Sequence, residues 1–238
     1  MKQAKLNFLG SSQVLGEITS EETAKKIINE TVSKFGSLDV LVNNAGAQVS
    51  DKEGRHGIDQ PIALYDQIFN LNVRSVIVLS QLAVPHLEKT KGAIINISSI
   101  VGELSTSPVS GPSSSSLDYS PQSSPYYSMA KAAVNSLTVQ MAGTLIHKGI
   151  RVNAVCPGLV QTNFLTSAGF NQEGSDSFYG SVGSDRKAIP LGRPGTVKDI
   201  TELIVFLADR SRSEYIVGQR IVSDGGSTLI NYMLTNEF

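Results

Sequence analysis

The 238-residue sequence contains a single cysteine, Cys156, and only three histidines, which are scattered along the chain. One thiol excludes an internal disulfide framework and fits a reducing compartment. Histidines without cysteine neighbours have none of the spacings of a zinc site, so we expect no metal. Cytoplasm is therefore the default location that we expect. Cys156 itself is interpreted as a small buried residue.

Runs of one charge and long apolar runs are also missing. The 20 basic and 21 acidic residues give a formal net charge of -1. This balance gives no indication of a nucleic acid or an anionic membrane surface as partner. The apolar stretches are shorter than a membrane span requires, and the first ten residues are too weakly apolar for a signal peptide. We expect no nucleic-acid partner and no membrane span.

The composition that remains is typical of a folded globular protein. Hydrophobic residues make up 40% and charged residues 17% of the chain, unlike a disordered sequence. The length fits one domain, residues 1–238. Short β-branched segments read as buried strands at 38–42, 93–97, 150–155 and 219–222. Helical periodicity is present at 20–36, 65–89, 126–148 and 196–208. Strands that alternate with helices predict an α/β fold with a doubly wound parallel sheet.

Two segments depart from this alternation. Residues 105–124 hold ten serines and three prolines and predict a flexible insertion, interpreted as a surface loop without a function of its own. Residues 163–186 are also rich in glycine and serine but carry aromatic side chains, which predict a lid over a partly apolar substrate. These aromatic residues are Phe164, Phe170, Phe178 and Tyr179.

Tyr127 and Lys131 stand four residues apart in a predicted helix, so their side chains share one face. A free phenol has a pKa near ~10 and is a poor base at neutral pH. A nearby cation favours the phenolate, and lowering that pKa by about three requires roughly 4 kcal/mol. The spacing alone is short and occurs on ordinary amphipathic helices.

The surroundings of this pair give it more weight. Small or polar residues follow three consecutive predicted strands, at 43–46, at 98–99 and at 157–158. The carboxyl ends of parallel strands meet at one edge of a sheet, which is where α/β sheets bind ligands. Tyr127 and Lys131 belong to the helix that leads into the third of these strands. One site at this edge is therefore predicted.

In these segments the chain resembles the short-chain dehydrogenase/reductase family, over roughly residues 13 to 228. The matching motifs are N-N-A-G at 43–46, N-L-N-V at 70–73, N-I-S-S at 96–99, Y-S-M-A-K at 127–131, R-V-N-A-V-C-P-G at 151–158, P-L-G-R-P at 190–194 and S-D-G-G at 223–226. The resemblance implies a Rossmann-like fold and a reaction that depends on NAD or NADP. That reaction interconverts a secondary alcohol and a ketone by hydride transfer.

The resemblance also implies residue roles. Tyr127 is expected to be the general acid/base, and Lys131 to lower its pKa and to hold the nicotinamide ribose. Ser99 is expected to hydrogen-bond the substrate oxygen, and Asn72 to hold a proton-relay water. The implied cofactor contacts are Asn44, Ala45, Gly46, Tyr127, Lys131, Pro157, Gly158, Val160 and Thr162.

One family feature is not found in the sequence, the glycine-rich turn T-G-x-x-x-G-x-G. The match begins near residues 13–18, which resemble the third strand of the family. We therefore expect a Rossmann-like sheet that is incomplete at the N-terminus and lacks the first two strands and the helix between them. The segment 38–42 would then form an exposed apolar edge. The preference for NAD or NADP is not readable.

Two other interpretations stay open. The chain is a catalytically inactive, shortened isoform or gene model that acts at most as an interaction partner, or it is a relative of the sugar-nucleotide epimerases. The epimerases share Y-x-x-x-K, but N-N-A-G and P-G-x-V-x-T favour the oxidoreductases. If the fold is completed, the resemblance of helices 65–89 and 126–148 to the family's dimerisation helices implies a homodimer or homotetramer.

Overall fold

A parallel sheet forms the centre of the molecule. The computed structural model describes residues 10–103 and 125–229. Within these residues the strands are β1 (Val40–Asn43), β2 (Ala93–Ile97), β3 (Arg151–Pro157) and β4 (Arg220–Ser223). They lie in the order β1-β2-β3-β4, and every neighbouring pair is parallel. The four predicted strands are confirmed. The predicted insertion at 105–124 falls outside the described residues.

The predicted helices are confirmed as well. The helices of the described residues are α1 (Glu21–Phe35), α2 (Ile62–Phe69), α3 (Ser75–Thr90), α4 (Pro125–Leu145), α5 (Phe164–Ser167), α6 (Gln172–Ser184), α7 (Val197–Ala208) and α8 (Arg210–Ser213). The predicted ones are α1, α2 with α3, α4 and α7. Ser20 caps α1 by accepting a hydrogen bond from the Thr23 amide. Gly36 ends that helix with the left-handed backbone that glycine adopts without strain. The predicted helix 65–89 is divided between α2 and α3 by a π-helical turn, Asn70–Arg74.

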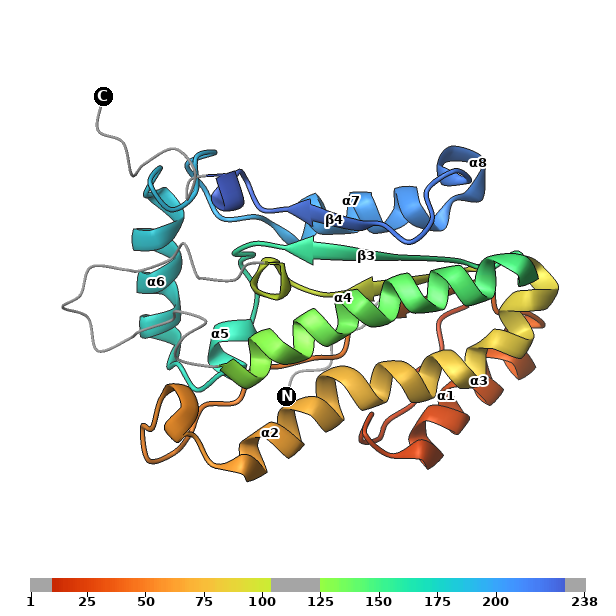
Figure 1. Cartoon of the computed structure of the whole chain (residues 1–238), viewed down its shortest axis with the longest axis horizontal. Coiled ribbons are helices and arrows are strands. Elements are labelled where there is room, and N and C mark those ends of the chain that lie inside the picture. Colours follow the sequence, from red (N-terminus) through yellow and green to blue (C-terminus); the bar gives the residue numbers. More distant parts are fainter. Residues whose placement is uncertain (1–9, 104–124, 230–238) are drawn as a thin grey trace.

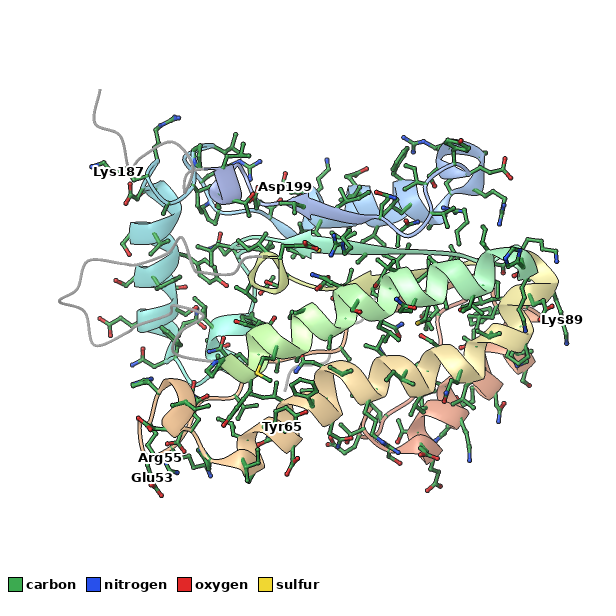
Figure 2. The ribbon with its side chains drawn as sticks, in the orientation of Figure 1. Glu53, Arg55, Tyr65, Lys89, Lys187 and Asp199 are labelled. Carbon is green, nitrogen blue, oxygen red and sulfur yellow. The ribbon has the colours of Figure 1, made fainter. Side chains whose placement is uncertain are left out.

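Helices cover both faces of the sheet, as the doubly wound fold predicts (Figure 1). Successive side chains of a strand point to opposite faces. Ile94 therefore packs with α1 and α3 on one face, whereas Ile95 packs with Ile200 and Leu207 of α7 on the other. Side chains fill the space between the layers (Figure 2). Each fully buried aliphatic side chain stabilises the fold by roughly 1.5–3 kcal/mol.

Among the described residues, β1 is an edge strand, and this agrees with the predicted apolar edge. Val42 on this strand is 39% exposed. The interpretation of residues 13–18 as a strand is wrong, because residues 11–15 have no regular structure and Gly16 lies in a bend. A strand is stable only beside a hydrogen-bonding neighbour, and this segment pairs with none of the described strands.

The helical run Ile62–Thr90 meets the test of length and apolar composition for a membrane-spanning helix, which was expected of no segment from the sequence. It is 29 residues long and contains an 18-residue window with a mean hydropathy of 1.3, which is enough by length and composition to cross a membrane. The core helix of a soluble protein passes the same test. Leu79, Ala83 and Leu87 of α3 are buried in the cluster that includes α1 and the sheet. The expectation of no membrane span stays a prediction.

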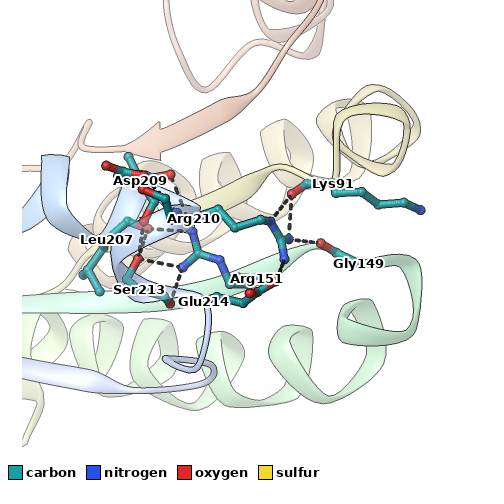
Figure 3. Close-up of polar contacts among 10 residues, drawn as sticks. Lys91, Gly149, Arg151, Leu207, Asp209, Arg210, Ser213 and Glu214 are labelled. Carbon is teal, nitrogen blue, oxygen red and sulfur yellow. Dashed lines mark hydrogen bonds and ion pairs between the residues drawn. The ribbon is translucent and has the colours of Figure 1, made fainter.

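Two arginines fasten the amino ends of the strands (Figure 3). Arg151 is 1% exposed and donates hydrogen bonds to the carbonyl oxygens of Leu207 at 2.9 Å and Ser213 at 3.1 Å. Arg210 donates to the carbonyls of Lys91 at 2.7 Å and Gly149 at 2.5 Å. These bonds satisfy carbonyl groups at or just beyond helix ends. The first residue of β3 is thereby tied to α7 and α8.

Candidate active site

Tyr127 and Lys131 lie near the amino end of α4, on the face that the sequence predicted they would share. The Lys131 side chain is 5% exposed, and its ammonium nitrogen donates to the Ile97 carbonyl at 3.0 Å. The same nitrogen lies 5.5 Å from the centroid of the Tyr127 ring. Ile97 is the last residue of β2, so the lysine is fixed at the carboxyl end of the sheet.

Asn72 reaches the same place from the π-helical turn. It is 1% exposed, and its amide nitrogen donates to the carbonyls of Ala47 and Ile68, each at 2.9 Å. Its Oδ1 is buried and has no hydrogen-bond partner among the described residues. A Cβ placed on Gly46 would lie 2.7 Å from this Oδ1 and 3.3 Å from the Lys131 nitrogen. The missing side chain of Gly46 thus leaves a small space between two polar groups.

The two serines after β2 differ in what they contact. Ser98 is buried, and its hydroxyl donates to the Lys131 carbonyl at 3.1 Å. Ser99 is half-buried, and its oxygen accepts from the Val101 amide at 3.3 Å, where it caps the short 3-10 helix Ile100–Gly102. In the described part of the chain, the Ser98 O–H is therefore already used in a hydrogen bond that holds the fold. Among the same residues the Ser99 O–H, in contrast, is free to donate. This difference supports the choice of Ser99.

Burial shifts the pKa of both residues of the pair. The protein packed around the Tyr127 phenol raises its pKa well above the usual range, although part of the side chain still contacts solvent. Burial lowers the pKa of Lys131 from 10.5 to about 8. The cause of the rise at Tyr127 is desolvation, and the expectation that Lys131 lowers the pKa of Tyr127 stays a prediction.

The turn after β3 lies at the same edge of the sheet. The Gly158 amide donates to the Ser223 carbonyl at 3.0 Å, and a Cβ on Gly158 would lie 2.7 Å from the Cβ of Asp224. Only glycine fits this close approach. Val160 is half-buried and Thr162 is exposed, as are Asn44, Ala45 and Gly46 at the end of β1. The predicted residues thus share one edge, and their contacts with a cofactor stay predictions.

The predicted lid, residues 163–186, forms α5 and α6 and not a chain without regular structure. Both helices lie at the end of the sheet toward which β3 and β4 point (Figure 1). The ring of Phe164 lies 5.8 Å from that of Tyr127. Phe178 contacts Phe170 edge-on at 6.1 Å and Tyr179 at 6.5 Å. Aromatic anchors hold this segment together, and its role as a lid stays a prediction.

A buried polar ladder was missed by the sequence reasoning. The Asn43 amide donates to the Asn96 side-chain oxygen at 2.8 Å and to the Ser80 hydroxyl at 3.2 Å. The Asn96 amide donates to the Thr138 hydroxyl at 2.9 Å. The ladder ties β1 and β2 to α3 and α4 directly behind the site. Its signal was an asparagine in each of two otherwise apolar strands.

A second feature that was missed is the aromatic cluster that packs against the first turn of α4, next to Tyr127. Tyr65 on α2 (Figure 2) contacts Tyr126 edge-on, with ring centroids 5.7 Å apart. The Tyr126 hydroxyl donates to the Gln60 carbonyl at 2.9 Å. Tyr127 packs at the border of this cluster with Ile68 and Ala130. The first turn of α4 is therefore anchored to α2 and to the residue Gln60 that precedes it.

Comparisons with known proteins match most of the chain. A family model described as enoyl-(acyl carrier protein) reductase covers residues 3–228. The meso-2,3-butanediol dehydrogenase of Serratia marcescens is 34% identical over 212 residues, which is 89% of this chain and 73% of that protein. The L-fucose dehydrogenase of Bos taurus is 30% identical over 224 residues, or 92% of this chain and 73% of that protein.

Solved structures match the fold as well. A short-chain dehydrogenase/reductase of unknown function from Caenorhabditis elegans, crystallised with cofactor, superposes with a TM-score of 0.83 at 41% identity. The match covers 93% of this chain and 76% of that one. A 7α-hydroxysteroid dehydrogenase complexed with NADH and 7-oxo glycochenodeoxycholic acid superposes with a TM-score of 0.71 at 30% identity, over 89% and 72% of the two chains.

Proposed function

The chain belongs to the short-chain dehydrogenase/reductase family, and we propose that it interconverts a secondary alcohol and a ketone with NAD or NADP. The observation that carries this proposal is the convergence of Tyr127, Lys131 and the unpartnered Oδ1 of Asn72 beside Gly46. The related proteins include named dehydrogenases, and the solved relatives include a complex with NADH.

The residues around Gly46 fit the nicotinamide end of such a cofactor. A buried oxygen without a partner and a buried amine both border the space that a Cβ at Gly46 would fill. Hydroxyl groups of a ribose can donate to the first and accept from the second. Lys131, Tyr127 and the turn with Val160 and Thr162 would hold the cofactor. When bound, the cofactor supplies or accepts the hydride.

The chain's own side chains handle the substrate oxygen and its proton. Ser99 donates its O–H to that oxygen. Tyr127 gives up its phenolic proton when the oxygen becomes an alcohol and takes it back in the reverse direction. Its raised pKa keeps the phenol protonated at neutral pH, which suits carbonyl reduction. Lys131 has a pKa of about 8, so near physiological pH its amine is present in both the charged and the neutral form.

Further properties of the protein belong to the same proposal. The rings of Phe164 and Tyr127 lie side by side, which favours a substrate with an apolar group next to its carbonyl. We also propose that the protein is cytoplasmic and that it assembles into a homodimer or homotetramer. The preference between NAD and NADP is left to experiment.

Replacing Tyr127 with phenylalanine tests the catalytic assignment. The variant keeps the ring and loses the proton, so we expect turnover of a carbonyl panel to fall by at least about 10²–10⁴-fold. The Kd of the reduced cofactor should change little, because the ring at position 127 is kept and the other cofactor contacts, Lys131 and Gly46 among them, are untouched. Tyr215, which is fully exposed, offers a matched tyrosine-to-phenylalanine control. Turnover by Tyr127→Phe at the wild-type rate would remove Tyr127 from the mechanism.

A further inference from the structure

Tyr179 is a buried tyrosine whose hydroxyl contacts only main-chain groups among the described residues. It lies in α6 and is 5% exposed. Its oxygen is 3.0 Å from the Val160 carbonyl oxygen and 3.3 Å from the Thr162 amide nitrogen. A phenol has one proton to donate and lone pairs to accept. Tyr179 can therefore donate to Val160 and accept from Thr162 at the same time.

The turn that Tyr179 contacts is held on its other side by the main chain. The Gln161 amide donates to the Gly195 carbonyl, and the Gly195 amide donates to the Leu159 carbonyl, both at 2.8 Å. These two bonds fix the start of the turn. The Thr162 amide, at its end, donates to the Tyr179 hydroxyl instead. The contact of Tyr179 with Thr162 closes a loop between residues 17 positions apart.

That loop contains Phe164, whose ring lies 5.8 Å from the ring of Tyr127. A second contact, from the Ser50 hydroxyl to the Ala168 carbonyl at 2.8 Å, ties the loop to the segment that follows β1. Thr162 is exposed, and its amide donates to the Tyr179 hydroxyl. The buried Tyr179 hydroxyl thus closes the loop 162–179, and Phe164 of this loop contacts the catalytic tyrosine, Tyr127.

We propose that the Tyr179 hydroxyl is a clasp that holds residues 162–179 closed beside Tyr127 and sets the Val160–Thr162 turn for the cofactor. Tyr179 is a positioning residue, because it touches neither Tyr127 nor Lys131. The cofactor part of this inference rests on the proposed function. The clasp itself rests on the contacts of the protein alone.

Hydrogen exchange in the cofactor-free protein tests the clasp directly. The Tyr179→Phe variant keeps the ring in the core and removes the hydroxyl, so the Thr162 amide loses its acceptor. We expect exchange at Thr162 and in the segment around Phe164 to become about tenfold faster, the effect of losing one hydrogen bond. Exchange in α4 should not change, which shows that the variant is folded. Tyr215→Phe, at a fully exposed tyrosine, is the control.

Cofactor titration and kinetics then test the positioning role. We expect Tyr179→Phe to raise the Kd of NADH or NADPH and the KM about five- to tenfold, with a smaller change in kcat, because Tyr127 and Lys131 are intact. Unchanged exchange at Thr162 would overturn the clasp. Faster exchange with an unchanged Kd would overturn the positioning role. If the wild-type chain binds no cofactor, the proposed function fails, and the exchange experiment still decides whether the clasp exists.

Discussion

The buried amine of Lys131 makes the stability of this protein depend on pH in a defined direction. Burial lowers its pKa from 10.5 to about 8. The folded state therefore gives up this proton more easily than the unfolded chain does. Below pH 8 both states are protonated and the folded state bears the full cost of a buried charge, about 3 kcal/mol. That cost disappears as the pH rises toward 10.5.

Replacing Lys131 with methionine removes this dependence. Between pH 7 and pH 9.5, the free energy of unfolding of the wild type should rise by about 2 kcal/mol relative to the variant. The variant also loses the hydrogen bond to the Ile97 carbonyl. That loss is independent of pH, so it shifts the variant's curve without changing its slope. The slope, and not the absolute stability, is therefore the quantity to compare.

Urea unfolding followed by circular dichroism at several pH values provides the measurement. Lys187→Met is the matched control, because Lys187 is an exposed lysine in the turn that follows α6 (Figure 2). The control should follow the wild type. If the difference between wild type and Lys131→Met stays constant from pH 7 to pH 9.5, the lysine is not held in a pKa-lowering site.

Three further perturbations test other parts of the molecule. Asn96→Ala removes one of the two acceptors of the Asn43 amide and the donor to Thr138, and should destabilise the protein by about 2–4 kcal/mol in urea; a loss below about 0.5 kcal/mol would contradict the role of the ladder. Gly46→Ala places a methyl group against Asn72 and should weaken NADH binding at least about tenfold in calorimetry, in samples that circular dichroism shows to be folded; equal affinity would remove Gly46 from the site. The rate of alcohol oxidation should rise with pH, because the base form of Tyr127 is scarce at neutral pH; a flat pH–rate profile would contradict the raised pKa.

Much of the fold could be predicted because its signals are local. Runs such as Ala93–Ile97 are short, β-branched and followed by polar residues, which is sufficient to place buried parallel strands. Once the strands are placed, their common direction brings Gly46, Ser99 and Gly158 to one edge without any knowledge of side-chain contacts. The helix spacing of Tyr127 and Lys131 is equally local.

The parts that could not be predicted depend on distant contacts. Residues 13–18 resemble a strand, but a strand needs a neighbour, and sequence pattern does not supply one. The rise in the pKa of Tyr127 comes from the protein packed around it, which no spacing reveals. The contact of Phe164 with Tyr127 and the hydrogen bonds of Tyr179 join residues of the lid to the site only after the chain has folded.

Calorimetric titration of the purified 238-residue chain with NADH and NADPH measures whether the site around Gly46 and Lys131 holds a nicotinamide cofactor. We expect saturable binding of at least one of them with a Kd in the micromolar range, weakened in Gly46→Ala and nearly unchanged in Tyr127→Phe. Circular dichroism of the same samples confirms that each is folded. Absence of binding to the folded wild-type chain would contradict the proposal that this site holds a nicotinamide cofactor.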